Sequence, residues 1–216
     1  KSRIDRQTAL GLRARAYLYM EEWVLAASDA AAASKGYVPA SMNEVSEPSF
    51  YDISEHNWIW GYDMTTDIAM SNPYATSSAW IRSFSGDGYS AGTQVYSCIN
   101  NLLYDKIPST DVRKGWWVDA SLESPLLSAV TWNGVSGNAV AALEIDNVKM
   151  KFLPYTNVKF GMAVVGGTLN DDDWPLMRVE EMILIQAEGL AKSGSENQAK
   201  ALLEDFVRTY RDPAYS

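Results

Sequence analysis

Tryptophan and tyrosine are the residues of this chain whose number and placement point most directly to a chemistry. The 216 residues include 8 Trp and 12 Tyr against 5 Phe, and 12 of the 20 Trp and Tyr lie between residues 51 and 132. Each of these rings has a flat apolar face and a hydrogen-bonding tip. A sugar ring has the matching surface, with C–H groups on one face and hydroxyls at its edge. The distribution predicts a glycan-binding region in the middle of the chain.

Eight residues of this region are the candidate ligand contacts. They are rings that can stack on a sugar and two polar side chains that can bind its hydroxyls: Trp58, Trp60, Tyr62, Trp80, Tyr89 and Trp116, with Asn72 and Asp87. One stacked ring contributes on the order of 1 kcal/mol, at about 25 cal/mol per Å². A millimolar complex needs about 4 kcal/mol, so several contacts must act together. The alternative for any one ring is that it packs a loop onto the helices, and the adjacent Trp116 and Trp117 cannot both point inward on a strand.

Other chemistries have weaker support in the sequence. It has no phosphate-binding Gly loop, no Cys pair at zinc spacing and no nucleophile elbow. The one His, His56, is expected to be a surface or hydrogen-bonded residue. The one Cys, Cys98, is expected to be buried on the apolar face of a helix from Val95 to Lys106. Asp171–Asp173 lack the alternating spacing of a calcium loop, and no catalytic residue, metal or cofactor is predicted.

The charge balance excludes one class of partner. The chain has 27 acidic and 18 basic residues, a net charge of −9, and no Lys/Arg cluster that could bind a nucleic-acid backbone. Its length suits one domain, and it has no apolar stretch long enough to span a membrane. It starts without Met or an apolar leader and stops just after a helix, so both ends are expected to be cut.

Two helical hairpins are expected at the ends, over 1–36 and 173–211. In the first, one apolar face is predicted from residues at steps of three and four: Ala9, Leu12, Ala16, Tyr19 and Trp23. An Ala-dense helix follows and ends at Gly36.

The second hairpin has clearer helix signals. Asp173 is predicted to cap its first helix with Pro175 in the first turn, and Ser195 to cap its second. The apolar stripes of the two helices are Val179, Met182, Ile183, Ala187 and Leu190, then Ala199, Leu202, Leu203, Phe206, Val207 and Tyr210.

Small residues relate the hairpins to each other. Ala14 and Ala26 are twelve residues apart, as are Ala187 and Ala199, and this spacing matches the packing positions of the tetratricopeptide helix–turn–helix unit. The alternative is two ordinary helical hairpins.

Residues 41–170 have a different character. Strands are predicted at Trp58–Tyr62 and at Val148–Phe152, and much of the rest is Ser, Gly, Asn and Thr around single aromatics. Long loops of this kind are rare unless they carry function, and their aromatics argue against disorder. The fold class predicted is mainly α, with tetratricopeptide-like hairpins and an irregular, loop-rich insert with little β structure.

Several segments resemble the SusD/RagB family. Trp174–Leu190 is similar to its helix motif, an apolar residue and Arg-x-x-Glu followed by Ala-Glu-Ala, with Gly189 in place of the second Ala. Gln198–Arg211 resembles the next helix, although the family's Asn-x-x-Arg reads Asp-Phe-Val-Arg here. The segments Ala14–Gly36, Glu55–Gly61 and Ile107–Trp116 also look like family landmarks, in family order.

The resemblance implies that residues 1–216 are a fragment of a single SusD-like domain, with no enzymatic activity. Members are lipid-anchored on the outer membrane, at the cell surface of Bacteroidetes. They capture oligosaccharides or other small nutrients beside a SusC-like TonB-dependent transporter. The lipidated Cys would lie upstream of Lys1, so it is not Cys98. The family has no shared ligand-binding motif. Arg178 with Glu180 or Glu181 is assigned to structure, as is Arg113, paired with Asp111 or with an acidic residue elsewhere.

Two other functions stay open at the level of the sequence. A tetratricopeptide-type adaptor could bind a peptide or protein, but it would need at least three stacked repeats. A surface glycoside hydrolase is also possible because the pairing of its two carboxylates is spatial and leaves no sequence motif.

Overall fold

The computed structural model describes residues 1–71, 98–132, 135–142, 144–145, 148–149, 152–161, 163–164 and 171–215. These residues belong to two compact units. The helical unit consists of Lys1–Ser41, Ile53–Asp63 and Trp174–Ser216, and the irregular unit of Met42–Asp52 and Met64–Asp173. Both units are therefore assembled from segments that are distant in the sequence.

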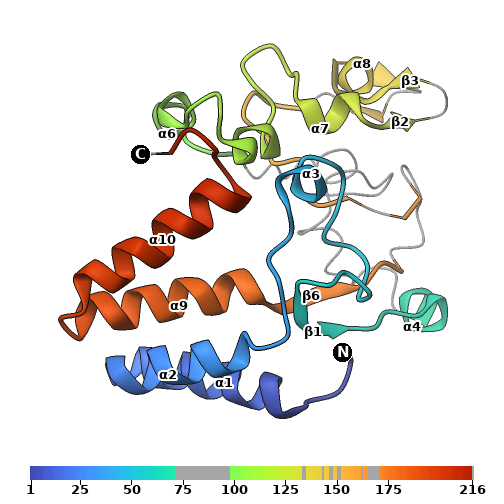
Figure 1. Ribbon diagram of the computed structural model, residues 1–216. Helices are drawn as coiled ribbons and strands as arrows, with labels where there is room; N and C mark the ends of the chain where they lie inside the picture. Colours follow the sequence, from blue (N-terminus) through green and yellow to red (C-terminus); the bar gives the residue numbers. More distant parts are fainter. Residues whose placement is uncertain are drawn as a thin grey trace. The chain divides into compact units, whose positions relative to one another are not determined.

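The helical unit contains two helical hairpins and one two-stranded sheet (Figure 1). Its elements are α1 (Arg6–Tyr19), α2 (Trp23–Ala33), β1 (Trp58–Tyr62), β6 (Trp174–Arg178), α9 (Val179–Lys192) and α10 (Glu196–Tyr210). Helix α2 packs against both α1 and α9, and α9 packs against α10. The helical prediction for both ends of the chain is confirmed.

Small side chains bring these helices close together. Ala14, Ala26, Ala187 and Ala199 are all buried, as their twelve-residue spacing predicts. At Gly189 an added Cβ would lie 2.5 Å from the backbone oxygen of Trp23. Helices α2 and α9 thus meet backbone to backbone at this point, which a larger residue would prevent.

The predicted packing face of α1 is wrong. Ala9 is exposed and Tyr19 is 91% exposed, whereas the buried residues of α1 are Thr8, Gly11 and Ala14. The face that packs is the one whose side chains are small enough for close approach. The half-buried Leu10, Leu12, Tyr17 and Leu18 pack against the same core beside these small residues. Of the residues on the predicted face, Ala9, Ala16 and Tyr19 are exposed.

The second hairpin follows its predicted stripe, with Val179, Met182, Ala187 and Phe206 buried. The prediction that its first helix starts with Asp173 as the cap and Pro175 in the first turn is wrong.

Residues Trp174–Arg178 form β6, which pairs antiparallel with β1, and α9 begins only at Val179. The Val179 N–H donates to the Asn57 carbonyl at 2.9 Å, a long-range contact that holds the preceding residues extended. Ser195 occupies the N-cap position of α10 as predicted, but its side chain makes no capping hydrogen bond.

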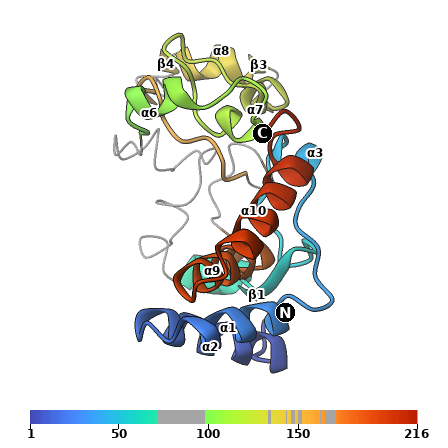
Figure 2. The ribbon, with the colours of Figure 1, turned by 60° about the vertical axis from the view of Figure 1, so that its left-hand side comes forward.

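The irregular unit consists of short elements (Figure 2). They are α3 (Met42–Val45), α4 (Thr66–Ser71), α6 (Asn101–Lys106), the 3₁₀ helix η1 (Val112–Trp116), α7 (Pro125–Ser128), β2 (Thr131–Trp132), β3 (Val135–Ser136), α8 (Gly137–Ala142), β4 (Glu144–Ile145) and β5 (Val148–Lys149). The strands pair as β2–β3 and β4–β5.

Side chains start several of these short helices. Asn100, Asp111 and Ser124 each accept a hydrogen bond from a backbone N–H in the first turn of α6, η1 and α7 respectively. The first N–H groups of a helix have no partner within it. In helices this short they are a large share of the backbone donors, so the caps contribute much of the local order.

Two sequence predictions in this unit are corrected. Cys98 is exposed and lies in an isolated bridge with Thr156, not in a helix, because the Asn100 side chain caps α6 and the helix begins at Asn101. Strand β5 ends at Lys149, and the buried Phe152 lies outside any strand, while residues 150–151 are outside the described part of the chain.

Candidate functional site

Strand β1 carries three of the predicted sugar-binding aromatics in different environments. Trp58 is fully buried, and its indole N–H donates to Glu55 Oε2 at 3.1 Å. Trp60 is half-buried against the apolar core of the helical unit, and Tyr62 is 41% exposed. Alternate residues of a regular strand share a face, but the β1–β6 register shifts on both sides of Trp60. Of the three, Tyr62 is the most exposed.

Tyr62 has an aromatic neighbour that the sequence analysis did not select. Trp174 is its partner across the β1–β6 ladder, with ring centroids 5.5 Å apart and planes tilted by 40°. The Trp174 indole N–H is buried and has no hydrogen-bond partner among the residues that the structure describes. Trp174 was missed because Trp-Pro was interpreted as the start of a helix. A long-range strand pairing leaves no local signal for this contact.

Trp116 belongs to the core of the irregular unit. Its indole N–H donates to the Val45 carbonyl at 2.9 Å, and its ring meets Phe50 edge-on at 5.9 Å. The Lys159 ammonium lies 4.4 Å from the centre of the Trp116 ring. Trp117 is half-buried, so the two adjacent tryptophans differ in burial as expected.

The other four predicted contacts lie outside the described residues. They are Trp80, Tyr89, Asn72 and Asp87. Their role in ligand binding stays a prediction.

A pocket of about 340 Å³ lies within the irregular unit, beside η1. Its apolar lining comes from Val112, Gly115, Pro125 and Leu126. Its polar lining comes from Ser46, Tyr104, Ser109, Thr110, Asp111 and Lys114. The sequence places Tyr104 in the aromatic-rich region, but nothing in it indicates that residues 46, 104–115 and 125–126 share one cavity.

The charged groups of this pocket are held in place by neighbours. The Lys114 ammonium donates to the Ile107 carbonyl at 2.9 Å and lies 4.9 Å from the centre of the Tyr104 ring. The Asp111 carboxylate binds Arg113, with Oδ1 2.9 Å from Nε and Oδ2 2.6 Å from Nη2, which confirms the predicted structural pair. This arrangement neutralises the carboxylate and orders the first turn of η1.

The uncharged polar groups of the pocket have hydrogen-bonding capacity left. Within the described part of the chain, the hydroxyls of Ser109 and Thr110 make no hydrogen bond, whereas Ser46 Oγ donates to the Met42 carbonyl at 2.6 Å. Burial, and secondarily the charge of Asp119, raise the pKa of the Tyr104 phenol, so it stays protonated at neutral pH. The pocket therefore offers neutral hydroxyls and one ammonium.

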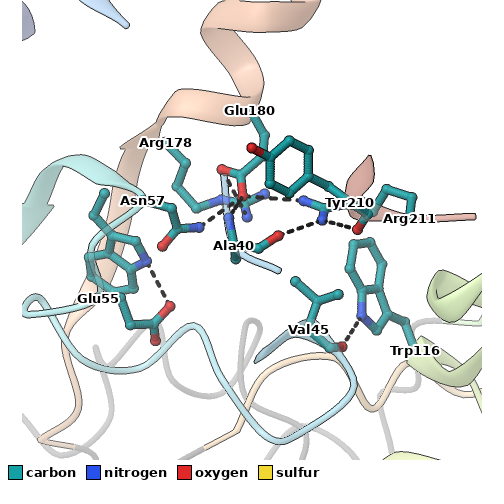
Figure 3. Close-up of polar contacts among 10 residues, drawn as sticks. Ala40, Val45, Glu55, Asn57, Trp116, Arg178, Glu180, Tyr210 and Arg211 are labelled. Atoms are coloured by element: carbon teal, nitrogen blue, oxygen red, sulfur yellow. Dashed lines mark hydrogen bonds and ion pairs between the residues drawn. The ribbon is translucent and has the colours of Figure 1, made fainter. Parts of the chain in front are cut away.

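Buried charges in the helical unit serve structure. Figure 3 shows side chains converging on Glu180, whose Oε1 accepts from the Ala40 N–H at 3.0 Å, Asn57 Nδ2 at 2.9 Å and Arg211 Nη2 at 3.2 Å. Arg178 Nη1 lies 3.6 Å from Glu180 Oε2, so the predicted structural role of Arg178 is confirmed. The cluster joins three segments far apart in the sequence.

The alternative partner considered for Arg178 has another role. Glu181 binds Arg15 through both carboxylate oxygens, with each N–O distance 2.6 Å. This pair connects α9 to α1, so both glutamates at the start of α9 hold the helical unit together.

The acidic run before β6 binds local donors. Asp173 Oδ1 accepts from the Met64 N–H at 2.8 Å, Asp172 Oδ1 from the Ala163 N–H at 3.0 Å, and Asp171 Oδ2 from the Thr66 hydroxyl at 2.9 Å. Asp173 therefore does not cap a helix as predicted. Among the described residues no three His, Cys, Asp or Glu side chains come together as a metal site.

Comparison of the sequence with known families and proteins finds no match: no family model matches the chain, and no curated protein matches it.

Comparison with solved structures is informative. A SusD-like carbohydrate binding protein of Bacteroides vulgatus aligns over 98% of this chain and 38% of its own, with a TM-score of 0.65 and 21% identity. A SusD superfamily protein of Bacteroides thetaiotaomicron aligns over 96% of this chain and 42% of its own, with a TM-score of 0.59 and 20% identity. A third structure, from Bacteroides vulgatus, has a TM-score of 0.64, 20% identity and coverage of 96% and 40%.

These alignments span nearly the whole chain but less than half the length of each solved structure. At this level of identity they establish the fold and leave the activity of this chain as a separate question. The predicted resemblance to SusD is confirmed at that level: the chain has the SusD-like fold.

Proposed function

We propose that this chain is part of a nutrient-capture protein that binds carbohydrate. The observation that carries the proposal is the alignment, over 98% of the chain, with a structure described as a SusD-like carbohydrate binding protein. The excess of Trp and Tyr, and a pocket lined by neutral hydroxyls and apolar groups, support the same ligand class. Of the predicted stacking rings on β1, Tyr62 is the best exposed, and its neighbour Trp174 on β6 is a further candidate.

The cellular setting follows from the resemblance to SusD/RagB proteins. We propose that the full-length protein is lipid-anchored at the outer surface of the outer membrane and works with a SusC-like TonB-dependent transporter. None of the described helices is long and apolar enough to cross a membrane. Co-purification of a large outer-membrane transporter with the affinity-tagged protein from its native host is the test. Recovery of the protein without any transporter would contradict this partnership.

The protein is proposed to bind its ligand without cleaving it. Glycoside hydrolases use two carboxyl groups that flank the scissile bond. Of the residues that line the η1 pocket, only Asp111 has a carboxylate, and it is held by Arg113. Incubation with the polysaccharides that the protein binds should release no new reducing ends. Release of reducing ends that tracks the protein through purification would refute the non-enzymatic function.

The direct test of carbohydrate binding is an array of oligosaccharides probed with the purified protein, beside a peptide array. We expect binding to one or more glycans and no binding to peptides. Isothermal titration with the best glycan should then give a saturable signal. Peptide binding with a silent glycan array would favour the tetratricopeptide-type adaptor instead.

A further inference from the structure

We propose that the pocket beside η1 holds one neutral pyranose ring of the bound glycan. The inference rests on the proposed carbohydrate-binding function and goes further, because it assigns a site and a class of sugar. The site combines Tyr104, the Ser109–Asp111 turn, Lys114, Gly115 and Pro125.

The size of the pocket favours a single ring. Ligand pockets in proteins commonly measure about 300–1,000 Å³, and the volume here, about 340 Å³, is near the lower end of that range. The methylene and methyl groups of Val112, Pro125 and Leu126 line it together with the bare backbone of Gly115. These apolar groups can contact the C–H groups of a pyranose.

The polar groups of the pocket match the hydroxyls of a sugar. The Ser109 and Thr110 hydroxyls, which have no partner among the described residues, can each donate and accept. The Lys114 ammonium has three N–H donors, and its hydrogen bond to the Ile107 carbonyl uses one. Ser109 and Thr110 are both exposed to solvent. A ligand with adjacent hydroxyl groups can replace the hydrogen bonds that these groups make to water, whereas a purely apolar ligand cannot.

The charges around the pocket favour a neutral sugar over an acidic one. Lys114 is the cation in the lining, but Asp111 is also in the lining, and Asp105 and Asp119 act electrostatically on Tyr104. A uronic acid would therefore meet carboxylates close to the ammonium. With Asp111 paired to Arg113, the charges that remain near the pocket are the Lys114 ammonium and the carboxylates of Asp105 and Asp119, which oppose it.

Two substitutions test the site without disturbing the core. In Gly115→Ala the new Cβ would lie 3.5 Å from Pro125 Cδ, an ordinary contact, so the methyl group should reduce the pocket while the fold is kept. Thr110→Val removes one hydroxyl and keeps the shape of the side chain. The matched control is Thr131→Val, at an exposed threonine of β2 that does not line the pocket.

The measurement is titration of each variant with the neutral oligosaccharide that binds best on the array, with thermal unfolding to confirm the fold. We expect Gly115→Ala to raise the Kd about tenfold or more, because the ring no longer fits. Thr110→Val should raise it about three- to tenfold, the equivalent of one neutral hydrogen bond. Thr131→Val should leave the Kd unchanged.

The possible results separate the two proposals. Glycan binding that is unchanged in both pocket variants would overturn this site and leave carbohydrate binding intact. A glycan array without any binding by the unaltered protein would overturn both. Preference for a uronic-acid oligosaccharide, lost in Lys114→Met, would show that the pocket takes an acidic sugar and overturn the assignment to a neutral one.

Discussion

The two units of this protein use polar side chains in opposite ways. In the helical unit the helices are 11 to 15 residues long, and polar side chains such as Glu180, Arg211 and Asn57 are buried and hydrogen-bonded to one another. In the irregular unit no described helix exceeds six residues, and the exposed hydroxyls of Ser109 and Thr110 have no hydrogen-bond partner among the described residues. The first arrangement stabilises a fold, whereas the second leaves groups available to a ligand.

Backbone hydrogen bonding explains this difference. A helix of several turns satisfies most of its own N–H and C=O groups, so side chains need only to pack. Short helices and two-residue strands leave many backbone groups unpaired, and side chains such as Asn100 and Ser124 must bind them. The pocket beside η1 is formed by loops and short helices of this kind.

The largest effect is expected from removing the carboxylate at the centre of the helical unit. The side chains of Glu180 and Arg211 are 5% and 3% exposed, so Glu180→Ala would leave a buried arginine without its counter-charge. The free energy of unfolding should fall by about 3–5 kcal/mol, measured by urea denaturation with circular dichroism.

The matched control for this substitution is Lys200→Ala. It breaks a surface pair with Glu204 in which the lysine side chain is 74% exposed, and it should cost less than about 0.5 kcal/mol. Equal effects of the two variants would mean that the buried cluster does not stabilise the helical unit.

A pair of glycines compares close packing in the two units. In Gly189→Ala the new Cβ would lie 2.5 Å from a backbone oxygen of α2, so the helices must move apart at a cost of about 1–3 kcal/mol. Gly115→Ala in the irregular unit meets only Pro125 at an ordinary distance and should change stability by less than about 0.5 kcal/mol. The same denaturation experiment measures both, and a reversed order would contradict the packing described for α2 and α9.

Adjacent tryptophans test the core of the irregular unit. Trp116→Phe removes the N–H that binds the Val45 carbonyl and should reduce the free energy of unfolding by about 1–3 kcal/mol. Trp117→Phe is the control, since Trp117 is half-buried and should tolerate the change with a smaller loss. Near-ultraviolet circular dichroism during denaturation measures the unfolding free energy of both variants. A larger loss of stability for Trp117→Phe would show that Trp117, and not Trp116, anchors this core.

The smallest effects concern alkaline pH. Burial raises the pKa of Tyr104 in the irregular unit and of Tyr37 in the helical unit above the ordinary value of 10.0. Above pH 10 the unfolded chain loses these protons first, so stability is complete below that pH and decreases as pH rises toward the folded-state pKa. Tyr104→Phe and Tyr37→Phe should each flatten this decline, measured as unfolding free energy against pH. An unaltered decline in both variants would exclude these two phenols as its source.

The helical unit is largely predictable from the sequence because its information is local. Periodic small residues identify Ala14, Ala26, Ala187 and Ala199 as packing positions, and Trp58–Tyr62 is recognisable as a strand. The errors in this unit arise where a distant partner intervenes. Residues 174–178 form a strand because β1 is beside them, and α1 packs through Gly11 because its neighbours require close approach.

The sequence by itself determined the helical hairpins, the concentration of aromatic residues and the resemblance to SusD-like proteins, because periodicity, composition and motif spacing are local properties. Only the tertiary structure decided which aromatics are buried, that Tyr62 lies against Trp174, and that Ser46, Tyr104 and Leu126 line one pocket. The physical reason is that a tryptophan has the same apolar face and polar tip in a core as at a binding site. Its surroundings are supplied by segments distant in the sequence, and they decide whether it packs in a core or contacts a ligand.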